Sequence, residues 1–434
     1  MRVLSPIRRH RFTPVRNWVV PIAYTALAIV LGFLIPRVDH HSLGTKLVAV
    51  SVISETAILS SMASGMMALT GITFSLVFVM VQFGSSAYSP RLVAMLARSR
   101  IIRHSAGVFI GTFLFALIAL STVDRQTNGM VPALTTIVAF CWMLCSILAL
   151  ILLIDRVTSL YISNVLSSIG QQGRQVIGTM YAWQGGDAEH PGRARNVPPW
   201  RGLPVTQTII YHGGPLSVVA FDLAGLVRLA HHADAIIEMT YAVGDTVVDG
   251  APLANVRGGS HRVKESQIKH AVILRTERTI VQDPKYALRL LADVAIRGLS
   301  PAVNDPTTAV MALDQIEDLL RRLGRADLDV GHEIDRQGAL RVVYPTPNWE
   351  DFLELALLEI INYGAHSIQV MRRLAALLDD LETMVLPSRQ AAVRRFSKRL
   401  HMSVEHSFVE PEDRQDAEEM DRQGLGLARQ EADD

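Results

Sequence analysis

Residues 132–154 read PALTTIVAFCWMLCSILALILLI, and this apolar run decides the class of fold. It carries no charged side chain, and its length is close to the ~20 residues that cross ~30 Å of hydrocarbon as a helix. Residues 105–122, SAGVFIGTFLFALIALST, are equally free of charge. Two further apolar runs precede them, at 17–36 and within 52–83. The sequence therefore predicts an α-helical integral membrane domain of four transmembrane helices within residues 1–160.

The rest of the chain has a more polar composition. The whole chain of 434 residues is 49% hydrophobic, but nearly all of the long apolar runs end by residue 155. The remaining chain is long enough for one or two soluble domains with their own cores. The net charge is +1 and the arginines are spread along the chain, which argues against a nucleic-acid partner.

The arginines predict the orientation of the spans. Arg2, Arg8, Arg9, Arg11 and Arg16 precede the first span, and Arg91, Arg98, Arg100 and Arg103 lie between the second and third. The alternate loops carry only Arg37 and Lys46 in one and Arg125 in the other. By the positive-inside rule, both termini are expected in the cytoplasm. Residues 89–101 also read as a short basic amphipathic helix at the membrane surface.

The second apolar run differs from the others. Its 32 residues would extend ~48 Å as one helix, so it must tilt, break or project beyond the bilayer. Ser60, Ser64, Gly71 and Ser75 fall along one helical face. Two interpretations stay open: close helix packing, which small residues permit, or the lining of a path through the membrane. Glu55 adds an ionisable group near one end, a candidate site by default, although it could simply reach water.

Residues 161–204 are predicted to be a helical extension of the fourth span followed by a linker rich in Gly, Pro and Arg. Residues 205–281 change to short β-branched runs that are cut by turns. Within them VGDTVVDGAPLANV, residues 243–256, resembles the small β-barrel of biotinyl and lipoyl carrier domains, so we expect a small β-barrel-like module. The acceptor motif of those domains is missing and Lys264 has polar neighbours. No covalent cofactor is therefore expected.

Residues 282–410 are predicted to form a helical cytoplasmic domain, and the acidic residues 411–434 a disordered tail. The best pattern is DPKYALRLLADVAIRGLSPAVNDPTTAVMALDQIEDLLRRL, residues 283–323, which predicts two helices joined by a short turn. Asp305 suits the N-cap of the second helix and Pro306 its first position. Asn304, Thr307 and Thr308 form a candidate anion site at this helix N-terminus, although a tight connection explains the same residues.

Three stretches together resemble one known family: GMMALTGITFSLVFVMVQFGSSAYSPRL at 65–92, GVFIGTFLFALIAL at 107–120, and DPKYALRLLADVAIRGLSPAVNDPTTAVMALDQI at 283–316. The family is the bacterial predicted membrane proteins with domain of unknown function 2254, and the resemblance covers nearly the whole chain. It implies a multi-pass protein of the bacterial inner (plasma) membrane. It supplies no activity and no catalytic residues.

Two classes of function are compatible with the motifs of the chain. The sequence contains no Walker motif, dinucleotide fingerprint, zincin helix or nucleophile elbow, which argues against an enzyme. His231 and His232 are adjacent, so one metal ion cannot easily use both. The first hypothesis is a homo-oligomeric channel or transporter with the second span lining the path. The alternative is a membrane-anchored regulatory or scaffolding protein whose cytoplasmic domain binds a partner or a small anion.

Overall fold

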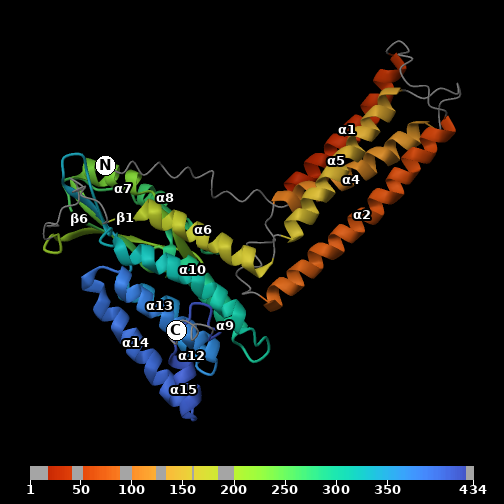
Figure 1. Cartoon of the computed structure of the whole chain (residues 1–434). Coiled ribbons are helices and arrows are strands. Elements are labelled where there is room, and N and C mark those ends of the chain that lie inside the picture. The colour runs from red at the N-terminus through yellow and green to blue at the C-terminus, as the bar shows by residue number, and fades with distance from the viewer. Residues whose placement is uncertain are drawn as a thin grey trace. The chain divides into compact units, whose positions relative to one another are not determined.

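The computed structural model places the described residues in two compact units (Figure 1). We call the helices that precede Tyr161 the helical unit and the part that begins at Ile162 the α+β unit. The structure describes residues 18–41, 52–87, 100–123, 133–158, 161–183 and 200–426. Most of the basic amphipathic helix predicted for residues 89–101 lies outside these ranges. Each unit has a hydrophobic core of its own.

Helix α4 is the centre of the helical unit, because it packs against each of the three other helices described there. The helices are α1 (Val19–His41), α2 (Val52–Ala87), α4 (Arg100–Val123) and α5 (Ala133–Thr158). Three of them are long and apolar enough to cross a membrane, over Ile53–Val79, Arg100–Ser121 and Leu134–Asp155. The apolar part of α1, Val19–Ile35, is shorter. The structure thus supports three of the four predicted spans by length and composition, and the first stays a prediction.

Helices α1 and α4 run in the same direction and in close contact. A Cβ atom added at Gly107, near the start of α4, would lie 2.6 Å from the ring of Tyr24, near the start of α1. A Cβ atom added at Gly32, later in α1, would lie 2.9 Å from Ile118, later in α4. Glycine thus permits an approach that any larger residue would prevent. The pairing extends along the apolar length of α1.

Helices α4 and α5 run in opposite directions and share buried hydroxyl groups. The Thr112 and Ser146 hydroxyls lie 2.8 Å apart, and the Ser105 hydroxyl donates to the carbonyl oxygen of Ala149 at 3.1 Å. The earlier residue of α4 meets the later residue of α5, which fixes the antiparallel direction. All three hydroxyl-bearing side chains are buried. Hydrogen bonds between membrane helices of this kind contribute about 1 kcal/mol each.

The α+β unit contains a mixed five-stranded sheet in the order β2-β6-β4-β10-β9. Its strands are β2 (Val205–Ile210), β6 (Pro252–Gly258), β4 (Ala235–Met239), β10 (Leu340–Val343) and β9 (His332–Ile334). β10 pairs with β4 in parallel, and the other pairs are antiparallel. A three-stranded sheet, in the order β5-β3-β7, joins β5 (Thr246–Val247), β3 (Leu216–Phe221) and β7 (Val272–Arg275). β1 (Ala182–Trp183) pairs with β8 (Ala326–Asp327).

The predicted β-barrel-like module of residues 205–281 is wrong, because these strands belong to two sheets that do not close. The edge of β4 that faces away from β6 pairs with β10, which comes from residues 340–343, well beyond the predicted module. Helix α7 (Leu223–Ala233) packs against β4 and β10, and helix α8 (Glu265–Ala271) packs against α7. The strands and turns of the segment were predicted correctly, but their partners lie too far along the chain for a local pattern to reveal.

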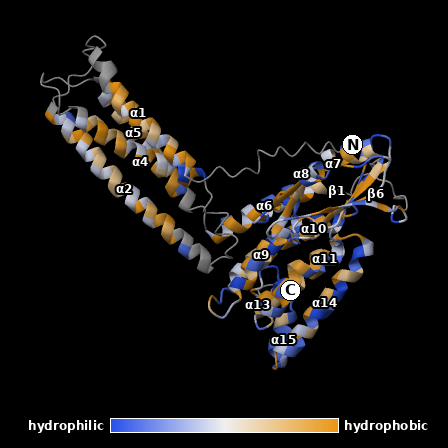
Figure 2. Ribbon diagram, turned by 180° about the vertical axis from the view of Figure 1, so that it is seen from behind, coloured by the Kyte–Doolittle hydropathy of each residue, from blue (hydrophilic) through white to orange (hydrophobic). Residues whose placement is uncertain are grey.

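Helices form the remainder of the α+β unit. They are α6 (Ile162–Met180), η2 (Ile280–Gln282), α9 (Pro284–Gly298), α10 (Pro306–Arg325), α11 (Trp349–Leu353), η3 (Glu354–Leu358), α12 (Glu359–Gly364), α13 (Ile368–Met384), α14 (Pro387–Ser407) and α15 (Pro411–Glu418). The predicted pair of helices in residues 283–323 is confirmed as α9 and α10. Figure 2 shows hydrophilic residues along α14 and α15, whereas apolar residues cover much of the helical unit.

Two predicted boundaries shift in the structure. Helix α6 was expected to extend the fourth span, but α5 ends at Thr158 and α6 packs against α9 and α10 in the other unit. The tail was expected to be disordered, yet α15 and the residues to 426 pack on α13. There Arg372 lies 3.2 Å from Asp416 and 3.4 Å from Glu419. These ion pairs use the acidic residues that suggested disorder, and residues 427–434 lie outside the described part.

Candidate functional site on helix α2

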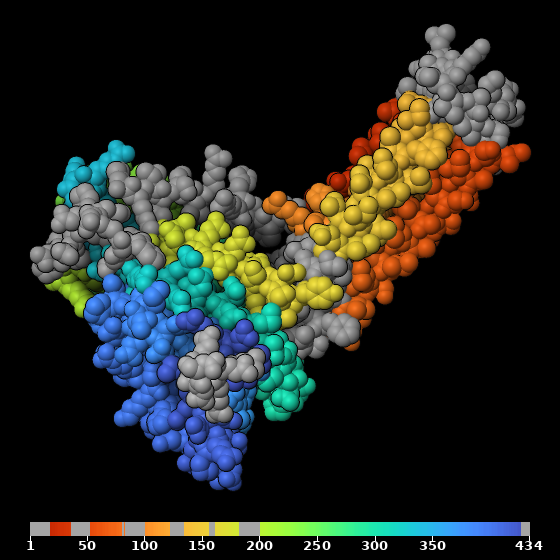
Figure 3. All heavy atoms as spheres, in the orientation of Figure 1, coloured from red at the N-terminus to blue at the C-terminus, as the bar shows by residue number. Residues whose placement is uncertain are grey.

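The small residues predicted along the second span lie on the outward face of α2. Ser60, Ser64, Gly71 and Ser75 are all exposed. At ~3.6 residues per turn they fall within about 60° of one another. No atom lies within 4 Å of a Cβ added at Gly71, apart from the helix itself. Figure 3 shows α2 along one edge of the helical unit. These residues therefore do not serve packing within one chain.

The hydroxyl of Ser64 is satisfied by its own helix. It donates to the carbonyl oxygen of Ser60 at 3.0 Å and lies 3.2 Å from that of Ser61. Such back-bonding lets a serine face an apolar surrounding without a large desolvation cost. The oxygen can still accept a hydrogen bond. The stripe of Ser60, Ser64, Gly71 and Ser75, called the outward stripe below, is therefore compatible with lipid, with another helix or with water.

Glu55, predicted in the same set, lies on the opposite face of α2. Nine residues separate it from Ser64, which at ~3.6 residues per turn is about half a turn around the helix. Its side chain is fully buried with Leu59 and Met62, on the face that packs against the rest of the unit. The structure therefore brings together four of the five predicted pathway residues and separates Glu55 from them.

Glu55 binds a partner that the sequence did not reveal. The hydroxyl of Thr136 donates to its Oε1 atom at 3.1 Å, inside the helical unit. Thr136 lies in the first turn of α5 and Glu55 in the first turn of α2, so both helices begin at the same end of the unit. A buried carboxylate of this kind can fix one helix to another or exchange a proton. The only signal was a pair of threonines at the start of an otherwise apolar span.

The two cysteines are four residues apart and lie on one face of α5. Cys141 and Cys145 are exposed and neither forms a disulfide. Within one chain they face outward beside Leu144 and Leu148, which are also exposed. The packing face of α5 instead carries Trp142 and Ser146, which are both buried.

The candidate anion site at the start of α10 is occupied by the protein's own carboxylate. Asp305 accepts a hydrogen bond from the amide of Thr308 at 3.1 Å, and the Thr308 hydroxyl donates to it at 2.6 Å. Thr308 is buried, whereas Asn304 and Thr307 are exposed. Asn304 has φ of 48°, a left-handed conformation that asparagine tolerates in turns. The predicted N-cap is thus present. Its carboxylate accepts hydrogen bonds from the Thr308 amide and hydroxyl, which a bound anion would otherwise use.

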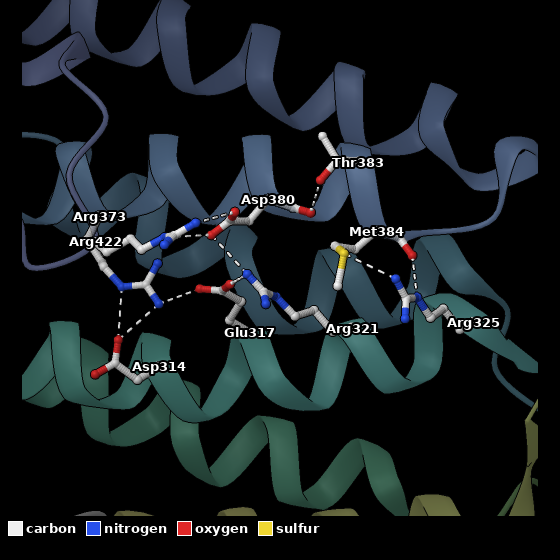
Figure 4. Close-up of polar contacts among 9 residues, drawn as sticks. All are labelled: Asp314, Glu317, Arg321, Arg325, Arg373, Asp380, Thr383, Met384 and Arg422. Carbon is white, nitrogen blue, oxygen red and sulfur yellow. Dashed lines mark hydrogen bonds and ion pairs between the residues drawn. The ribbon is translucent and has the colours of Figure 1, made fainter. Parts of the chain in front are cut away.

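Several charged side chains in the α+β unit form ion pairs that join its helices to one another. Figure 4 shows ion pairs of alternating sign that connect α10 to α13 and to the segment after α15. Arg373 is 3% exposed and lies 2.9 Å from Asp314, and it also contacts Glu317. The series comprises Asp314, Arg373, Glu317, Arg321, Asp380 and Arg422. The three arginines balance the three carboxylates, which indicates a structural role.

A second charged cluster joins α7 to the turn between β9 and β10. The Asp335 carboxylate accepts hydrogen bonds from Arg341 at 2.7 Å and from the backbone amide of Ala339 at 3.0 Å, and His231 lies 3.0 Å away. Burial alone would raise the pKa of Asp335, but these contacts outweigh it and hold the pKa well below its usual range. His231 and His232 are both exposed to solvent, and His231 also contacts this carboxylate. Within the described residues, no group of three or more His, Cys, Asp or Glu could hold a metal ion.

The fold and the site define a membrane protein with a bundle of apolar helices followed by an α+β unit. The chain belongs to the family of predicted membrane proteins with domain of unknown function 2254, whose model matches residues 16–380. It is 26% identical over 412 residues to the uncharacterized protein Rv1290c of Mycobacterium tuberculosis and, likewise, to the uncharacterized protein Mb1321c of Mycobacterium bovis. The match covers 92% of this chain and 78% of each relative. No solved structure matches the chain.

Proposed function

We propose that the protein is a homo-oligomeric channel or transporter in which the outward stripe of α2 from several copies lines the path. One observation carries the proposal: Ser60, Ser64, Gly71 and Ser75 are small or polar, share one face and are exposed. Among the described residues outside α2, no atom lies within 4 Å of a Cβ added at Gly71. This face is exposed in the single chain, so a path along it needs several copies around one axis. These serine and glycine residues do not specify which ion or solute is transported.

We propose further that all four helices cross the inner membrane, with both termini in the cytoplasm. Helix α1 runs parallel to α4 from Tyr24 to Gly32 and so follows it along its apolar length. The direction alternates between successive helices, since α5 is antiparallel to α4 and begins at the same end as α2. The arginine-rich segments lie before α1 and between α2 and α4, which favours these ends as the cytoplasmic ones.

The alternative is a membrane-anchored regulatory or scaffolding protein. It is favoured by the large apolar side chains that share the exposed surface of α2 with the outward stripe. Met67 is 63% exposed, Phe74 77% and Phe78 62%. Such a surface suits lipid or close contact with another helix without a path. The α+β unit would then bind a partner or a small anion.

A matched pair of glycine substitutions separates the two functions. Gly65 and Gly71 both lie on α2, and no atom lies within 4 Å of an added Cβ at either, apart from the helix itself. Six residues place Gly65 about 120° around the helix from Gly71. Gly71→Leu should abolish ion or solute flux in proteoliposomes while the oligomer, measured by size in detergent, stays intact. Gly65→Leu should leave flux unchanged.

Three other outcomes would count against a channel. The first is wild-type protein that carries no tested ion or solute, and the second is a Gly65→Leu variant that blocks flux as strongly as Gly71→Leu. Loss of the oligomer in Gly71→Leu would instead assign the outward stripe to packing between copies, because small interfacial residues permit close contact.

A further inference from the structure

The start of α6 and the turn between α9 and α10 lie at the same end of the α+β unit. The Arg174 guanidinium of α6 lies 3.0 Å from Asp318 of α10. A Cβ atom added at Gly170 would contact Gln315. Earlier residues of α6 thus meet earlier residues of α10, and the helices run parallel. With this register the first residue of α6, Ile162, lies level with the first turn of α10.

The start of α6 is joined to the end of α5 by a short stretch of chain. The apolar span of α5 reaches Asp155, α5 ends at Thr158, and α6 begins at Ile162. The three residues between the helices reach at most ~14 Å between the flanking Cα atoms, at ~3.6 Å per residue. If α5 crosses a membrane, the start of α6 therefore cannot be far from the surface where α5 emerges.

The turn at this end exposes apolar side chains. Pro301, Ala302 and Val303 are exposed, with Val303 at 39%, although the turn connects two well-buried helices. The end of α12 packs beside it: a Cβ added at Gly364 would lie 3.4 Å from Leu299. Next to that glycine, Tyr363 is 60% exposed. An exposed tyrosine beside a short apolar turn suits the boundary between headgroups and acyl chains.

The charges around the turn also fit a lipid surface. Between Arg297 and Thr307 the only acidic residue is Asp305, whose carboxylate caps α10. Arg297, in the last turn of α9, is exposed, and so is His366 just beyond α12. Basic and aromatic side chains around an apolar tip are favourable at a membrane with anionic headgroups.

We propose that the turn of residues 300–304, together with Tyr363, inserts shallowly into the lipid headgroup region where α5 leaves the bilayer. We take the occupant of this apolar patch to be lipid, because the patch lies at the same end of the α+β unit as the start of α6, which follows α5 after three residues. The contact would hold the α+β unit in one orientation on the bilayer. It requires that α5 crosses the membrane, and it does not depend on the proposed channel.

Fluorescence quenching in nanodiscs of the full chain, made with phosphatidylcholine and phosphatidylglycerol, tests this proposal. Cys141→Ser and Cys145→Ser remove the native thiols, and Val303→Cys provides one site for an environment-sensitive dye. The matched control is Val248→Cys, which replaces another half-exposed valine, at 49% exposure, just after β5. Lipids that carry a nitroxide close to the headgroup should quench the dye at residue 303 several-fold more than at residue 248. The emission at 303 should also be blue-shifted.

A second labelling site makes the result independent of one turn. Tyr363→Cys should be quenched like Val303→Cys, because the two residues share the proposed contact. Solvent-like emission at 303 with no quenching would overturn the proposal, as would equal quenching at 303 and 248. The quenching measurement does not depend on flux. A negative result would therefore overturn the lipid contact alone and leave the proposed channel to its own test.

Discussion

Helices α4 and α2 carry similar small residues and use them in opposite ways. In α4, a Cβ added at Gly107 would meet the Tyr24 ring at 2.6 Å, and one added at Gly111 would meet the Trp142 ring at 2.9 Å. In α2, no atom of the other described residues lies within 4 Å of a Cβ added at Gly65 or Gly71. Half of the apolar window of α4 is buried, against 17% in α2. Small residues in α4 are therefore explained by packing within the chain, and those in α2 require something outside it.

The largest effect should come from filling the α1–α4 contact. Gly107→Leu would force a branched side chain against Tyr24 and the backbone of Pro21, which lies 3.3 Å from an added Cβ. Overpacking of this kind costs up to about 3 kcal/mol, and sometimes more. Unfolding of the detergent-solubilised protein by SDS should show that loss. Equal stability of Gly107→Leu and the wild type would remove the contrast between the two helices.

A smaller effect is expected where hydroxyl groups join α4 to α5. Thr112→Val keeps the side-chain shape but removes the contact to the Ser146 hydroxyl, which lies 2.8 Å away and is fully buried. The expected loss is about 1 kcal/mol, because the serine can still bond to its own helix. The same SDS titration measures it, with Thr70→Val as control, since the Thr70 hydroxyl donates within α2 to the Met66 carbonyl. A larger loss for the control would contradict the assignment.

Removal of the hydrogen bond between α2 and α5 should lower the stability by a similar amount. Thr136→Val removes a donor to the buried carboxylate of Glu55. We expect a loss of about 1 kcal/mol in the SDS titration, since hydrogen bonds between membrane helices are modest. Glu55→Gln combined with Thr136→Val should cost less than the sum of the two single losses, because both substitutions alter the same hydrogen bond. Fully additive losses would show that Glu55 and Thr136 do not act together.

The smallest effect should be that of the outward stripe on the stability of the single chain. Gly71→Leu adds four carbons where the chain places no neighbour. The free energy of unfolding of its monomer should lie within about 0.5 kcal/mol of the wild-type value, as for other surface substitutions. SDS unfolding at a protein concentration that gives monomers measures this, and a loss as large as that of Gly107→Leu would place Gly71 inside a packed interface.

Local patterns in the sequence predicted the elements well. Asp305, followed by proline, begins α10 as its predicted N-cap, because a short acidic side chain can accept the first free amides of a helix. Asp283 caps α9 in the same way. The apolar runs likewise gave the position of the three helices that can cross a membrane. These features depend on neighbours within one or two turns, so a single sequence contains the information.

Contacts between distant residues could not be predicted. β10 pairs with β4 across about 100 residues, and this pairing replaces the expected closure of a barrel. Thr136 and Glu55 are 81 residues apart, and nothing in either span indicates the other. The pattern placed Ser64 and Gly71 on one helical face correctly, but periodicity alone could not say whether that face points into the bundle or away from it.

The accessibility of α2 to water is the most direct test of a path along the outward stripe. In the Cys141→Ser, Cys145→Ser background, Ser64→Cys and Ser75→Cys place thiols on the outward stripe, and Gly65→Cys places one about 100° from Ser64 on the same helix. A membrane-impermeant reagent reacts with thiolates, which need water. A water-filled path predicts rapid labelling of oligomers in liposomes at residues 64 and 75 and little at 65. No labelling at 64 and 75, or equal labelling at all three, would contradict a path along α2.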